Sequence, residues 1–221
     1  MSDKHKTLIW DLPIRIFHWS IVILIVFSWY CIEIEDDLEN HFLSGYCILA
    51  LLLFRLIWGF FGTCHVKFKH MLYKPADIKA YAKTFFARKA SAHAGHNPLG
   101  SLSAFALLGI LGLQVGTGLF ATDEDYYFGP FSETVSSKLA NRITEIHHLN
   151  FDILTGLIVL HICAIVFYLI YKKDNLITAM LTGRKKLLEG NNNAISSSKL
   201  ITALLSLIFS ATAVYLLVNF V

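Results

Sequence analysis

Long apolar stretches alternate with short polar ones along the chain. Residues 16–32, 99–122, 153–171 and 201–221 carry no Asp, Glu, Lys or Arg, and residues 42–61 carry only Arg55. A hydrocarbon core about 30 Å thick needs roughly 20 residues of helix to cross it. In lipid, an isolated segment must close its backbone hydrogen bonds internally, as a helix does. The pattern predicts five transmembrane helices, the first four at about residues 13–33, 41–62, 98–121 and 145–172.

The composition agrees with a membrane protein. The 221 residues are 55% hydrophobic and 16% charged, whereas a soluble domain carries roughly 25% charge. An ordinary water-soluble enzyme is therefore excluded, and the 30 aromatic residues (17 Phe, 9 Tyr and 4 Trp) exclude a disordered chain. A net charge of +3 is too small to indicate nucleic-acid binding, so we expect no nucleic-acid partner.

The basic residues predict how the spans are oriented. Sixteen of the 19 Lys and Arg residues lie in the N-terminal arm and in residues 63–98 and 172–199. Residues 33–40 contain five acids and no basic residue. Because Lys and Arg accumulate on the cytoplasmic side of membranes, the pattern predicts a cytoplasmic N-terminus and a C-terminus on the outer side of the membrane.

The connections carry weaker signals. In residues 75–88 the apolar side chains share one helical face, which predicts a short basic helix on the anionic inner leaflet. Residues 191–198 read as a polar tether, so we divide the chain into a core at residues 1–190 and a tether with the fifth helix at residues 191–221. Aromatic residues near the span ends fit an aromatic belt at the membrane interfaces: Trp10, Trp19, Trp29, Tyr30 and Trp58.

Histidines in the apolar segments are the main candidates for function, since polar groups inside a membrane are costly. His147 and His161 are 14 residues apart, about 21 Å along a helix and about 40° short of four full turns. They therefore share one face of the fourth span, whereas His148 points elsewhere.

The predicted topology places the histidines in two pairs by depth. His18 and His161 lie toward the cytoplasm, and His41 and His147 lie at the outer face. Two imidazoles from different helices at one level are what bis-histidine haem ligation requires. No C-x-x-C-H motif occurs, which favours two non-covalent haem b groups.

Other readings of these histidines stay open. Interhelical hydrogen bonds are one alternative. Another is a haem-free zinc or copper carrier with a thiol from Cys31, Cys47 or Cys163. In the third span, Gly109, Gly112 and Gly116 would let either another helix or a flat cofactor approach closely.

Four segments of the chain resemble the bacterial cytochrome b561 and nickel-hydrogenase b-type cytochrome family. They are WDLPIRIFHW (10–19), HFLSGYCILALLLFRLIWGFFG (41–62), GHNPLGSLSAFALLGILGLQVGTGLF (95–120) and EIHHLNFDILTGLIVLH (145–161). The resemblance covers residues 8–183 and implies a four-helix core with two b haems. Its ligand pattern falls on His18, His41, His147 and His161, and it does not include His148. We therefore expect an all-α integral membrane helical bundle, a four-helix haem-binding core plus a fifth C-terminal transmembrane helix.

The resemblance also implies a place in the bacterial inner membrane, which makes the outer C-terminus periplasmic. It further implies electron transfer between the quinone pool and a periplasmic redox protein. That partner is a hydrogenase, another oxidoreductase subunit or a c-type cytochrome, and quinone or quinol is the expected diffusible substrate. The alternative is a stand-alone superoxide:quinone oxidoreductase, as some short relatives are. The acidic outer loops, including residues 123–125, count against attraction of superoxide. They would either steer a basic partner or simply follow the sorting of charge across the membrane. The fifth span has no histidine, so we expect it to pack or to recruit a partner.

Three further residues are candidates at the inner edge of the membrane. Arg55 would either pair with a haem propionate or snorkel to the interface. His65 and His96 would donate to a propionate or a quinone oxygen, relay protons, or simply be solvated loop residues.

Overall fold

The computed structural model describes residues 5–88, 93–123, 127–187 and 199–220. Within these residues, five helices are long and apolar enough to cross a membrane. They are α1 (Leu12–Glu33), α2 (Leu38–Phe61), α4 (Pro98–Gly118), α5 (Ser137–Ile170) and α7 (Leu200–Asn219). The five predicted helices are confirmed, and the expected tether at residues 191–198 lies outside the described residues.

Local sequence signals set where the helices begin. The side chain of Asp11 accepts from Ile14 N ahead of Pro13, and Asn97 accepts from Gly100 N ahead of Pro98. Both sites combine a capping residue with proline at the first or second helical position, where its missing N–H is harmless. Helix α5 begins about eight residues earlier than expected, after the Ser136 cap. Its 34 residues span about 51 Å, longer than the hydrocarbon core.

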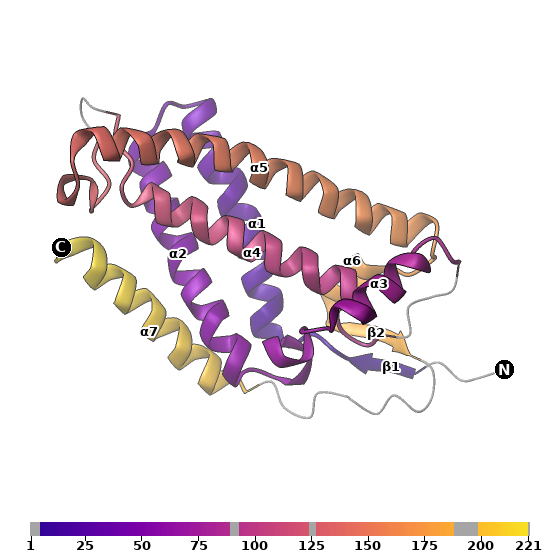
Figure 1. Cartoon of the computed structure of the whole chain (residues 1–221). Helices are drawn as coiled ribbons and strands as arrows, with labels where there is room; N and C mark the ends of the chain where they lie inside the picture. The colour runs from indigo at the N-terminus through magenta and orange to yellow at the C-terminus, as the bar shows by residue number, and fades with distance from the viewer. Residues whose placement is uncertain (1–4, 89–92, 124–126, 188–198, 221) are drawn as a thin grey trace.

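The long helices lie side by side in pairs (Figure 1). Helix α1 packs on α2, α4 packs on α5, and α2 also contacts α4 and α7. We call residues 5–11, 62–88, 93–97 and 171–187 the basic end, and residues 34–37, 119–123 and 127–136 the acidic end. Figure 1 shows β1, β2, α3 and α6 gathered at the basic end, near the N-terminus, with the C-terminus at the opposite end.

A two-stranded ribbon at the basic end was not predicted. Strand β1 (His5–Leu8) pairs antiparallel with β2 (Arg184–Leu187), which follows α6 (Leu176–Thr182). Gly183, at φ +77°, turns the chain between α6 and β2, and its carbonyl accepts from Ile9 N and Trp10 N. A Cβ at this position would lie 2.5 Å from Trp10 O, so a glycine is required there.

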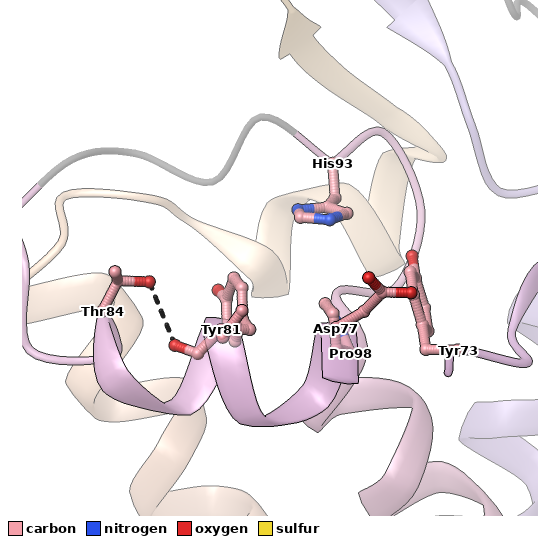
Figure 2. A pocket seen from close by; sticks show the side chains of 7 residues that line it. Tyr73, Asp77, Tyr81, Thr84, His93 and Pro98 are labelled. Atoms are coloured by element: carbon pink, nitrogen blue, oxygen red, sulfur yellow. Dashed lines mark hydrogen bonds between the residues drawn. The ribbon is translucent and has the colours of Figure 1, made fainter. Parts of the chain in front are cut away.

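Helix α3 (Pro75–Lys83) is shorter than the predicted helix at residues 75–88. The Tyr81 hydroxyl lies 2.7 Å from that of Tyr168, so α3 packs against the end of α5. A pocket of about 490 Å³ lies beside α3 (Figure 2), and none of the four candidate histidines lines it. Its lining includes Tyr73, Asp77, Tyr81, His93 and Pro98.

The aromatic belt was predicted correctly only in part. Trp29 and Tyr30 are 43% and 41% exposed at the acidic end of α1, as a belt requires. Trp10 and Trp58 are buried instead, because they pack in the hydrophobic core at the basic end. The basic end also contains two short 3-10 turns, at Cys64–Val66 and Phe68–His70.

Candidate functional site

The structure brings His41 of α2 and His147 of α5 together near the acidic end. Their ring centres are 6.2 Å apart, and the two ring planes make an angle of 84°. Two imidazoles on opposite sides of one metal ion, with metal–nitrogen bonds of about 2.0 Å, have ring centres about 6 Å apart. The separation therefore suits two axial ligands of one iron.

Hydrogen bonds orient the His41 ring. Its Nδ1 lies 3.1 Å from the backbone carbonyl oxygen of Ser28 and 3.0 Å from the Ser28 hydroxyl. Because a carbonyl oxygen only accepts, Nδ1 carries the proton and Nε2 keeps a free electron pair. A backbone acceptor on the second nitrogen is the usual support of a metal-binding histidine.

His147 is held in the same way from α4. Its Nδ1 lies 2.9 Å from the backbone oxygen of Gln114 and 3.1 Å from the Thr117 hydroxyl. The Gln114 side-chain amide, 3.0 Å from Nε2 of His147, therefore donates to it. Asn150 Nδ2 in turn donates to Gln114 Oε1 at 2.7 Å. This buried chain of polar groups was not predicted from the sequence, although Gln114 and Asn150 stand out as polar residues in apolar segments.

A cavity of about 280 Å³ adjoins these two histidines. It is close in size to the smaller cofactor pockets. Gly45, one turn beyond His41, lines the cavity, and a Cβ added there would meet no atom within 4 Å. A Cβ on Gly118 would lie 3.1 Å from the His147 ring. The open space at Gly45 and the free Nε2 electron pair of His41 fit a flat, iron-containing ring, which would have to displace the Gln114 amide from Nε2 of His147.

The second pair, His18 of α1 and His161 of α5, lies toward the basic end. The two rings are within electrostatic range of each other. Nδ1 of His18 is buried without a hydrogen-bond partner among the described residues. His161 lies 14 residues beyond His147 on one continuous helix, so the two pairs are about 21 Å apart along α5. The geometry thus groups the histidines as the sequence predicted, and their role as ligands stays a prediction.

His148 lies beside this arrangement. Its ring centre is 6.1 Å from that of His147, and the residue lines the same cavity. Among the described residues, no three His, Cys, Asp or Glu side chains gather as a metal-binding group. A pair of histidines from two helices is the donor set of bis-histidine haem, whereas zinc sites take three or four protein ligands.

Arg55, His65 and the Nδ1 atom of His96 are buried at the basic end, so two of the alternative interpretations were wrong. Arg55 is 4% exposed and does not snorkel, because the turn after α2 covers it and Val66 O accepts from Nη2 at 3.1 Å. His65 is 9% exposed, and Nδ1 of His96 is buried, so neither is a solvated loop residue. Burial, followed by repulsion from Arg55, His161 and His18, lowers the pKa of His96 to about 4.

The glycine stripe of α4 is not a close helix contact. A Cβ added to Gly109, Gly112 or Gly116 would meet nothing within 4 Å in the described part of the chain. Of the two readings, close packing of another described helix is therefore wrong, and approach of a flat cofactor stays a prediction.

A profile of the family described as prokaryotic cytochrome b561 matches residues 9–183. The chain belongs to the prokaryotic cytochrome b561 family. The match includes α1, α2, α4 and α5 with all four candidate histidines and leaves out α7. With the five apolar helices, it makes this cytochrome a multi-pass membrane protein of a family that binds b-type haem.

Three relatives share the name probable Ni/Fe-hydrogenase B-type cytochrome subunit. The protein from Bradyrhizobium diazoefficiens is 24% identical over an alignment of 216 residues. The match covers 80% of this cytochrome and 85% of the relative. That from Rhizobium leguminosarum bv. viciae is 22% identical, with 83% and 90% covered, and that from Rhodobacter capsulatus is 23% identical, with 80% of each covered. No solved structure was found to match the chain. These findings confirm the suspected family.

Proposed function

We propose that this cytochrome carries electrons through the membrane on two b haems. His41 and His147 hold one haem near the acidic end, and His18 and His161 hold the other toward the basic end. The observation that carries the proposal is the 6.2 Å separation of the His41 and His147 rings, with each Nδ1 directed at a backbone carbonyl. Haem b, when bound, supplies one-electron redox chemistry.

The protein contributes position and environment. The carbonyls of Ser28 and Gln114 accept from the ring nitrogens, which fixes the imidazoles and increases the basicity of their Nε2 atoms. Leu111, Val115 and Leu154 line the cavity with apolar surface. Helix α5 holds one ligand of each pair, so it fixes the spacing between the two sites.

The charge distribution supports an orientation in the inner membrane. The basic end lies in the cytoplasm under the positive-inside rule, and the acidic end faces the periplasm. The names of the three relatives support a Ni/Fe hydrogenase as the periplasmic partner. Electrons then pass between this partner and the quinone pool.

Two measurements test the proposal. A pyridine haemochrome assay on the purified cytochrome should give two b haems per chain, and one haem or none would overturn the paired sites. In native membranes, hydrogen gas should reduce the cytochrome, and His147→Ala should abolish this reduction. If two haems are present but hydrogen does not reduce them, the hydrogenase assignment fails while the di-haem assignment stands. Rapid reduction by superoxide in the purified protein would favour the stand-alone enzyme.

A further inference from the structure

We propose that Arg55 and His96 form a carboxylate site that takes a propionate of the haem at the basic end. This inference rests on the proposed function, because it presumes a haem between His18 and His161. The structure contributes two buried polar atoms without partners, Arg55 Nη1 and His96 Nδ1, on separate segments of the chain.

Arg55 is enclosed on several sides. Its Nη2 donates to Val66 O at 3.1 Å and lies 3.5 Å from the sulfur of Met71, and its guanidinium carbon lies 4.6 Å above the Phe68 ring. Nη1 has no partner, and within the described part of the chain Arg55 forms no ion pair. A buried guanidinium without an anion is strongly destabilising, so the arrangement calls for a negative ligand.

The buried acid of this region, Asp11, does not supply that ligand. Its carboxylate accepts from Ile14 N at 2.9 Å, from Trp58 Nε1 at 3.1 Å and from the Thr63 hydroxyl at 2.6 Å. The negative charge of Asp11 acts on Arg55 from beyond ion-pair distance. Asp11 therefore reduces the cost of burying the guanidinium while leaving Nη1 free.

His96 is the second residue of the proposed site. It precedes α4, its carbonyl accepts from the Tyr73 hydroxyl at 2.8 Å, and its ring packs 4.8 Å from that of Trp10. Arg55, His161 and His18 all lie within electrostatic range of His96. A carboxylate on the edge of a haem held by His18 and His161 would thus meet Nη1 of Arg55 and Nδ1 of His96. A neutral quinone oxygen would leave the guanidinium charge uncompensated.

Gly59 makes room for the Phe68 ring that packs on Arg55. A Cβ at Gly59 would lie 2.1 Å from the Phe68 ring, so only glycine lets Phe68 cover Arg55. Arg55, Phe68 and Gly59 therefore depend on one another: Gly59 makes room for Phe68, and Phe68 packs on Arg55.

Redox titration and haem content of purified variants test the proposal. Arg55→Leu removes a positive charge that disfavours the oxidised haem. We expect the midpoint potential of the haem at the basic end to fall by at least about 59 mV, which corresponds to a tenfold shift in a one-electron equilibrium. Arg55→Lys should restore most of the shift. Arg88→Leu is the matched control, because that guanidinium lies over the Tyr171 ring at the same end.

Selective loss of the haem at the basic end in Arg55→Leu, with retention in Arg55→Lys, also supports the proposal. Unchanged potentials in Arg55→Leu overturn it, as does equal damage to both haems or equal damage by the Leu and Lys variants. A raised KM for quinol with unchanged potentials would assign Arg55 to a quinone site instead. If the unmodified cytochrome lacks two haems, the proposed function itself fails, which distinguishes the two failures.

Discussion

Replacement of Asp11 by alanine tests how the basic end is held together. The carboxylate is fully buried and joins three segments: it caps α1 and accepts from Trp58 of α2 and from Thr63 beyond α2. Loss of a helix cap costs about 1 kcal/mol. Leaving a buried donor unpaired costs about 1–3 kcal/mol. With two such donors, we expect Asp11→Ala to destabilise the protein by about 4 kcal/mol.

The assay is thermal unfolding in detergent, followed by tryptophan fluorescence, in which Trp58 is a direct reporter. A chain of this size loses about 2–4 °C in Tm per kcal/mol, so Asp11→Ala should lower Tm by about 10 °C. Asp37→Ala is the control, because Asp37 also caps a helix but its side chain accepts from Asn40 and Glu39 of that same helix and joins no other segment. Equal shifts in the two variants would show that the contacts to Trp58 and Thr63 contribute nothing.

Three further substitutions probe the haem sites. Gln114→Leu removes the amide that donates to Nε2 of His147 and so competes with haem iron for that nitrogen. Because such a hydrogen bond is worth about 1 kcal/mol, haem added to the apoprotein should bind about fivefold more tightly at that site. Weaker haem binding in a spectroscopic titration would contradict this competition. His148→Ala should retain two haems in the pyridine haemochrome assay, so loss of one would make His148 a ligand. Gly59→Ala should displace Phe68 and lower the potential of the haem at the basic end, as Arg55→Leu does. Unchanged midpoint potentials in Gly59→Ala would show that the position of Phe68 does not influence how Arg55 acts on the haem.

The spans were predictable because burying a backbone in lipid leaves the chain little choice but helix. Five apolar runs sufficed to locate α1, α2, α4, α5 and α7. The first turns of α5, from Ser137, were missed because hydropathy marks only the part of a helix that lies in lipid. The β1–β2 ribbon was missed because two four-residue strands rich in Lys carry no readable alternation.

The candidate site was predictable where helix geometry alone decides it. The 14-residue spacing puts His147 and His161 on one face, and the alternation of the spans puts His18 at the depth of His161 and His41 at the depth of His147. Contacts that depend on irregular backbone could not be read in this way. Arg55 looked like an interfacial arginine until the turns at Cys64–Val66 and Phe68–His70 were seen to cover it.

The haem content of four purified single variants tests the central claim most directly. His18→Ala and His161→Ala should each lose the same haem, His41→Ala and His147→Ala should each lose the other, and every variant should keep one. The midpoint potential of the remaining haem identifies which one was lost. Loss of different haems by His41→Ala and His147→Ala, or two haems in any of the four, would contradict the pairing.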